Sequence, residues 1–369
     1  MTFHRFRPVS AAMVTAALLF SVLFFPLPFA FGQQPADRLS STLFTVKPVT
    51  SGVWALVVKP ATPSLAVSNA AVIELGDKVM VVDSHLSPSA AREASRLIAA
   101  LTGNKPVRYL VNTHWHPDHV QGNSTYSSAF PGAIDIISHV NTRRDIIALE
   151  MPFIKDQKLA LPKQVADAKR QLESGKVDGR TMTDEQKRRL ENQIAQGEAL
   201  IKEIENLEVT LPTLTLDRSM TLHAGDREVR ILYFGRGHTE GDVVIFLPKE
   251  KVLVTGDLLT NSIPFMRDAY PAEWSATLAG VERLDYTQNI PGHGDIQQGK
   301  ERLQMLRAFL DDLIPAVRRA VDSGKTLDQA KKDVKLELAP RHEKNFPSWN
   351  GGAEASIERT YKQMTSGSR

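Results

Sequence analysis

Short apolar runs separated by turn-forming residues open the chain after its first fifty positions. Two such runs, residues 52–59 and 69–74, are rich in Val, Ala and Ile, and the sequence Gly-Asp leads from the second into a third run at 78–83. Strands joined by a Gly-Asp pair predict a β-hairpin. Residues 87–103 instead repeat their apolar positions every three or four residues and end on a glycine, which predicts a helix.

The same alternation returns in the second half of the chain. Further strands are predicted at residues 107–111, 228–234, 243–247, 252–255 and 288–290, and closing helices at about 299–323, 327–338 and 354–364. Strands followed by helices, twice over, predict an α/β fold in which two sheets pack face to face between helical layers.

Residues 151–207 interrupt this pattern with a charged, aromatic-poor segment of helical period. Thr183 and Gln186 form a capping-box pair, and apolar residues follow them at spacings of three and four. An earlier stripe of Val165, Ala168 and Leu172 precedes the loop SGKVDG. We expect an inserted helical hairpin whose balanced charges form a solvated outer face.

The N-terminus carries a targeting pattern. A positively charged start precedes an uncharged apolar run over residues 11–25, shorter than the roughly 20 residues that span a bilayer. Ala30 and Gly32 then supply small side chains. We expect residues 1–32 to be a signal peptide cleaved near Gly32, with an uncleaved anchor as the alternative. The mature protein would be periplasmic or secreted, with no stable membrane span.

Composition limits the chemistry. The 369 residues include no cysteine and carry a formal net charge of +3. Disulfides and thiolate ligands are therefore excluded, and any metal must be held by nitrogen and oxygen. Because the sequence contains no block of basic residues that could bind along a phosphate backbone, nucleic acid is a poor candidate partner.

The stretch NTHWHPDH, directly after the predicted strand at 107–111, concentrates metal-capable side chains. His114 and His116 share one side of an extended segment, and a proline then places Asp118 and His119 at the start of the next helix. This pattern favours a metal site over a polar loop that is merely rich in histidine.

Three later strands end close to a metal-capable residue. His238, Asp257 and His293 follow the predicted strands at 228–234, 252–255 and 288–290. Side chains collected from several strand ends are typical of an active site. Three histidines for one ion, with Asp, His and a bridging carboxylate for a second, would fill two sites and leave room for water.

In this order, VVDS, THWHPDH, GRGHTEGD, VTGDLL and PGHGD resemble the motifs of the metallo-β-lactamase superfamily over roughly residues 52–295. The resemblance implies an αββα sandwich, which we expect over residues 43–300 including the insertion, followed by a helical extension at 301–369. It also implies ligands for two Zn²⁺ ions per chain: His114, His116 and His238 on one, Asp118, His119 and His293 on the other, and Asp257 bridging. Asp83 of VVDS would orient ligands by hydrogen bonding.

Two positions narrow the resemblance. Asp257 stands where the first two lactamase subclasses have Cys, and is similar to the thioesterase, lactonase and related hydrolase branches. His116 is Glu in the diiron flavoprotein branch. The segment around His238 and Asp257 also resembles exported zinc hydrolases found beside sulfur-oxidation and quinoprotein systems. Iron and manganese remain alternatives to zinc for such nitrogen and oxygen ligands.

These features predict a hydrolase in which a metal-bridged hydroxide attacks the acyl bond of a small ester, thioester, lactone or lactam, with Asp118 as proton shuttle. True β-lactam hydrolysis is one alternative. The other is a metal-binding partner of a periplasmic redox system that docks through the inserted hairpin.

Other side chains receive weaker assignments. His85 is expected at a surface turn more than in the pocket. Arg267 is a minor candidate for binding a substrate carboxylate. The aromatic residues Phe265, Tyr270 and Trp274 would either wall a pocket or pack under the closing helices. The remaining histidines are expected to be structural or exposed: His139, His223 and His342.

Overall fold

The computed structural model describes residues 39–60, 64–130, 132–177 and 179–366. The predicted signal peptide at residues 1–32 lies outside these ranges. Among the described residues, no helix is both long enough and apolar enough to cross a membrane.

The first sheet has seven strands in the order β1-β2-β3-β4-β5-β6-β9. Its strands are β1 (Phe44–Thr50), β2 (Val53–Val58), β3 (Ala70–Leu75), β4 (Lys78–Val82), β5 (Val107–Val111), β6 (Asp135–His139) and β9 (Leu214–Leu216). Strands β1 to β4 are antiparallel neighbours, whereas β4, β5, β6 and β9 run parallel. The predicted hairpin is confirmed as β3–β4, with Gly76 at a φ of 68° in its turn.

The second sheet has six strands in the order of the chain. They are β10 (Ser219–Ala224), β11 (Arg227–Tyr233), β12 (Val243–Leu247), β13 (Val252–Gly256), β14 (Gln288–Pro291) and β15 (Gln297–Gln298). Only the β13–β14 pair is parallel. The parallel pair aligns the ends of β13 and β14, from which Asp257 and His293 follow.

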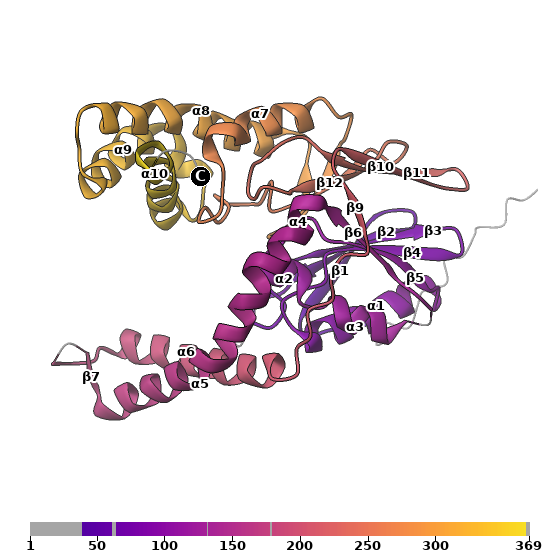
Figure 1. The fold of residues 1–369 in the computed structure, drawn as a ribbon, viewed down its shortest axis with the longest axis horizontal. Helices are drawn as coiled ribbons and strands as arrows, with labels where there is room; N and C mark the ends of the chain where they lie inside the picture. The colour runs from indigo at the N-terminus through magenta and orange to yellow at the C-terminus, as the bar shows by residue number, and fades with distance from the viewer. Residues whose placement is uncertain (1–38, 61–63, 131, 178, 367–369) are drawn as a thin grey trace, which may run out of the picture.

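The two sheets bury their inner faces against each other, in a core that includes Val53, Ile73, Ile231 and Val254. The outer face of the first sheet is covered by α1 (Pro88–Thr102) and α3 (Asn123–Ala129). Four helices and the second sheet share another core: α7 (Pro271–Glu282), α8 (Glu301–Asp322), α9 (Leu327–His342) and α10 (Trp349–Thr365). The predicted αββα sandwich is confirmed (Figure 1).

The insertion leaves the first sheet after β6. A continuous rod of α4 (Val140–Asp145), a π-helical turn (Ile146–Glu150) and α5 (Met151–Ser174) leads to the short β7–β8 ribbon (Lys176–Val177 and Arg180–Thr181). The chain returns along α6 (Asp184–Ile204), and the hairpin projects from the body (Figure 1).

The hairpin has a small core of its own, as its apolar periodicity predicts. Val165, Ala168, Leu190 and Ile194 pack together between α5 and α6. A Cβ on Gly197 would lie 2.4 Å from Cγ2 of Val165, so glycine lets the helices approach. The predicted capping box at the start of α6 is present.

Candidate metal centre

Four chain segments bring the seven predicted ligands to one edge of the sandwich. After β5, a short bend carries His114 and His116 to α2 (Pro117–Val120), where Asp118 and His119 occupy the first turn. Pro117 at the first helical position needs no hydrogen-bond partner for its nitrogen, so the helix can begin immediately after His116. The other three ligands follow later strands of the second sheet: His238, Asp257 and His293.

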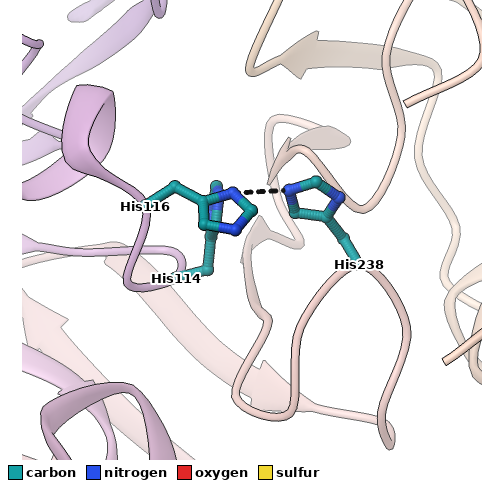
Figure 2. Close-up of side chains that lie close together, drawn as sticks. All are labelled: His114, His116 and His238. Atoms are coloured by element: carbon teal, nitrogen blue, oxygen red, sulfur yellow. Dashed lines mark hydrogen bonds between the residues drawn. The ribbon is translucent and has the colours of Figure 1, made fainter. Parts of the chain in front are cut away.

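Three imidazoles form the first group. His116 Nδ1 lies 3.1 Å from His114 Nε2 and 2.9 Å from His238 Nε2, and the rings point toward one another (Figure 2). Bond lengths of 2.0–2.1 Å to zinc place neighbouring nitrogens of a tetrahedral site about 3.3 Å apart. The spacing of the three nitrogens therefore fits one tetrahedral metal ion.

The second group joins two imidazoles and a carboxylate. Asp118 Oδ2 lies 3.3 Å from Nε2 of both His119 and His293. Asp257 stands between the groups, because its Oδ2 is 3.5 Å from His238 Nε2 and 3.1 Å from His293 Nε2. His114, His119 and Asp257 form a third set that overlaps both groups. Within each of the three sets, the candidate ligand atoms lie within 4.8 Å of one another.

Some buried polar atoms at the centre have no hydrogen-bond partner, and a metal ion could take the place of that partner. Within the described part of the chain, His119 Nε2 and Asp257 Oδ1 are buried and form no hydrogen bond. Leaving such an atom unsatisfied costs roughly 1–3 kcal/mol. The donor set is entirely nitrogen and carboxylate oxygen, so the cluster fits a divalent metal ion.

Hydrogen bonds behind the ligands select which nitrogen faces the centre. Thr113 donates its hydroxyl proton to Asp83 Oδ2 and can accept from His114 Nδ1 at 3.0 Å. His119 Nδ1 donates to the same Asp83 oxygen at 2.8 Å. Each donation leaves the Nε2 lone pair free for a metal. Asp83 therefore has the orienting position that its motif implies.

Two further ligands are held from behind by groups that the sequence does not reveal. His116 donates from Nε2 to Asp268 Oδ2 at 3.1 Å, and His293 from Nδ1 to the carbonyl of Val67 at 3.1 Å. Asp268 lies 152 residues from its partner, in a stretch where the sequence indicated candidate roles only for aromatic residues and Arg267. No spacing rule connects such a pair.

The glycines of the ligand loops are required by close packing. A Cβ on Gly292 would lie 2.0 Å from Oδ1 of Asp257, and one on Gly256 would lie 2.3 Å from Oγ1 of Thr113. Gly256 also has a φ of 51°, which disfavours other residues. These glycines let the ends of β13 and β14 approach the ligands.

Burial and neighbouring charges divide the histidines into two kinds. Burial, reinforced by the adjacent His116, lowers the pKa of His238 to about 3, and burial likewise holds the pKa of His114 far below its usual value. At His293, burial is outweighed by the Asp257 and Asp118 carboxylates, which raise the pKa to about 10. A metal ion bound beside Asp118 would therefore displace a proton from His293, whereas His114 and His238 are already neutral.

The prediction for His85 was wrong. Its ring is fully buried, contacts Phe44 at a centroid distance of 4.6 Å and bonds through Nδ1 to the carbonyl of Ser68 at 2.9 Å. Burial lowers its pKa to about 4. A turn residue with a φ of 72° can still be enclosed, here by Phe44 of β1 and the segment at Ser68.

The aromatics after Asp257 take different positions. Trp274 is completely buried in the core beneath His238, with ring centroids 5.8 Å apart. Phe265 remains 54% exposed while its ring lies 5.8 Å from that of His116. Phe265 is therefore available to a substrate at the edge of the centre, and Trp274 is a packing residue.

The family profile described as metallo-beta-lactamase superfamily matches residues 64–145 and 165–313, which is more than half of the chain. The chain belongs to the metallo-β-lactamase superfamily. Members of this superfamily are metal-dependent hydrolases that typically use zinc, and they include lactamases and sulfatases. The interruption of the match falls at the π-helical turn and the first half of α5, where the insertion begins.

The individual relatives have names that describe different activities. A "Metallo-beta-lactamase type 2" of Bacillus cereus is 32% identical over 91 residues, covering 23% of this chain and 36% of the relative. A "Linear primary-alkylsulfatase" of a Pseudomonas species is 20% identical over 312 residues, covering 80% of this chain and 54% of the relative. A solved metallo-β-lactamase from Pontibacter korlensis aligns with a TM-score of 0.52 at 16% identity, over 73% of this chain and 99% of its own.

Proposed function

We propose that this superfamily member is a dinuclear zinc hydrolase that cleaves the acyl bond of a small ester, thioester or lactone. The observation that carries the proposal is Asp257, whose Oδ2 lies within 3.5 Å of a nitrogen from each ligand group. A carboxylate in that position can bridge two ions. Ions bound there would lower the pKa of a water molecule towards neutrality and polarise the bond to be cleaved.

The chain's own side chains supply positioning and proton transfer. Asp118 is 15% exposed in its side chain against 6% for Asp257, so it is the carboxylate that a substrate and its leaving group can reach. We assign Asp118 the role of proton carrier to the leaving group. Asp83 and Asp268 fix the rings of His119 and His116. The exposed ring of Phe265 offers contact to an apolar part of the substrate.

Sulfate ester hydrolysis is the second candidate. The similarity to the alkylsulfatase extends over 312 residues, whereas the similarity to the type 2 lactamase covers only 91. This chain spans about half of the alkylsulfatase and about a third of the lactamase. β-Lactam cleavage is less favoured, because Asp257 occupies the position of the cysteine in the first two lactamase subclasses.

Export remains part of the proposal, on the strength of the N-terminal pattern. The alternative role as a docking partner of a periplasmic redox system rests on the projecting hairpin, where Leu159 is 74% exposed. Deleting about residues 158–207 would then abolish association with the partner. Retained association after this deletion would exclude docking through the hairpin.

A hydrolysis screen coupled to metal analysis tests the proposal. Purified protein is assayed on esters, thioesters, lactones, lactams, phosphoesters and sulfate esters, with His116→Ala as the test variant. Loss of a direct ligand should reduce turnover by at least about a hundredfold, since even outer hydrogen-bond partners of such ligands cost 10–100-fold. The control is His223→Ala, on the exposed edge strand β10 away from the ligands. Acyl turnover that survives His116→Ala would reject the assignment.

A further inference from the structure

A basic cavity of about 820 Å³ lies among α7, α8 and α10, apart from the metal ligands. Its wall carries four cationic side chains and one carboxylate: Arg236, Arg318, Arg359, Lys362 and Glu273. We propose that this cavity binds a small organic anion that carries a phosphate group. The proposal is independent of the reaction at the metal centre.

Two of the four cations already have carboxylate partners. Arg236 Nε donates to Glu273 at 2.9 Å, and Lys362 pairs with Glu358 at 2.5 Å. Arg359 instead donates to the backbone carbonyl of Ala269 at 2.7 Å, and no carboxylate in the described part of the chain forms an ion pair with it.

Arg318 completes the excess of positive charge. It is exposed on α8, and its guanidinium has no hydrogen-bond or ion-pair partner within the described residues. Arg318 and Arg359 therefore contribute two unneutralised charges to one cavity wall. A monoanion would balance one of them, whereas a phosphate monoester carries about −1.5 to −2 at pH 7.

The cavity wall is held in place before any ligand arrives. The ring of Tyr270 has the guanidinium of Arg236 at 4.4 Å from its centroid and that of Arg359 at 5.9 Å. Thr277 donates its hydroxyl to the carbonyl of Arg236 at 2.7 Å, which ties that residue to α7. Anchored guanidinium groups lose little freedom on binding and match phosphate oxygens in a two-pronged geometry.

The size and remaining lining argue for an organic ligand. A volume of about 820 Å³ falls in the range of roughly 300–1,000 Å³ found for small-molecule sites, and it exceeds what a bare ion fills. Ala272 and Met364 add apolar surface, and Thr360 and Gln363 add neutral polar groups. A phosphate on the arginines would leave these residues for the organic part.

Calorimetric titration of the full-length protein with glycerol phosphate tests the site. Arg318→Ala removes an exposed side chain without a partner, so the fold should be unaffected. Arg319→Ala is the matched control, because Arg319 is the next residue of α8, is exposed and pairs with Glu337 outside the cavity. We expect Arg318→Ala to weaken binding at least tenfold, which is about 1.4 kcal/mol, and Arg319→Ala to leave it unchanged.

A second variant separates this site from the metal centre. Glycerol phosphate that binds only at the ligand cluster would lose affinity in His116→Ala and keep it in Arg318→Ala, which would overturn the proposal. Absence of measurable binding to the unmodified protein at millimolar concentration would also overturn it. Binding that is kept in His116→Ala and lost in Arg318→Ala is the expected result.

Discussion

The metal centre and the inserted hairpin differ in how tightly their side chains are packed. At the centre, five of the seven candidate ligands are buried and the other two are partly exposed, and the loops that carry them pack so tightly that glycine is required. The hairpin has a four-residue buried core between its helices and a second small cluster at its base, and most of its other side chains are exposed to solvent. We therefore expect metal binding to depend on a few close contacts, whereas the hairpin should tolerate substitution.

The largest effect is expected for Gly292→Ala. The new Cβ would lie 2.0 Å from Oδ1 of Asp257, so the carboxylate that joins the ligand groups must move. We expect metal binding to weaken by a hundredfold or more, on the order of 3 kcal/mol, as measured by competition with a chelator. Gly351→Ala is the control, because a Cβ there meets nothing within 4 Å. Equal metal affinity in the two variants would contradict the packing argument.

The next effect concerns Glu150, at the junction of the hairpin with the metal loop. Burial raises its pKa from 4.5 to about 7, despite the hydrogen bond from Gln121 at 2.8 Å. The folded protein therefore holds a proton that the unfolded chain releases, and the free energy of unfolding falls as pH rises from about 4.5 through 7. Glu150→Gln should remove this loss.

The size of the Glu150 effect follows from the shift. A pKa of about 7 in the folded protein against 4.5 in the unfolded chain corresponds to about 3 kcal/mol of relative stability at pH 8. Urea unfolding of both proteins at pH 5 and pH 8 measures it. If the difference in the free energy of unfolding between the two proteins does not grow from pH 5 to pH 8, ionisation of Glu150 does not destabilise the fold and the prediction is wrong.

A smaller effect is expected inside the hairpin. Leu190→Ala removes one of four buried side chains between α5 and α6, which should cost about 2 kcal/mol locally. Because this core is separate from the cores of the sandwich, turnover and metal content should stay within about twofold of the unmodified protein. Hydrogen exchange of α6 should increase while that of β13 does not. Loss of metal in this variant would mean that the hairpin supports the centre.

The contrast between the regions also explains what the sequence could predict. Continuous apolar strands such as β12 and β13 were predicted within one residue, because burial on both faces marks them, and the capping box marked the start of α6. The strands β1, β6, β9 and β10 were not predicted. β1 and β10 lie at sheet edges, where β10 alternates exposed and half-buried positions, and β9 has only three residues.

The candidate site divides in the same manner. All seven candidate ligands could be named from the sequence because each is a metal-capable residue that follows a strand within a recognisable motif, and the structure brings their side chains together. Asp268 and the carbonyl of Val67 could not, since their roles arise only when loops distant in the sequence meet. The burial of His85 was missed for the same reason.

The metal stoichiometry of the purified protein and of two variants shows whether the chain holds two ions. We expect about two zinc ions per chain, and about one in Asp118→Ala and in His116→Ala, because each variant removes a candidate ligand of a different group. Zinc content would be measured by elemental analysis after dialysis against metal-free buffer. A single ion in the unmodified protein that is lost in His116→Ala and unaffected by Asp118→Ala would contradict the two-site account.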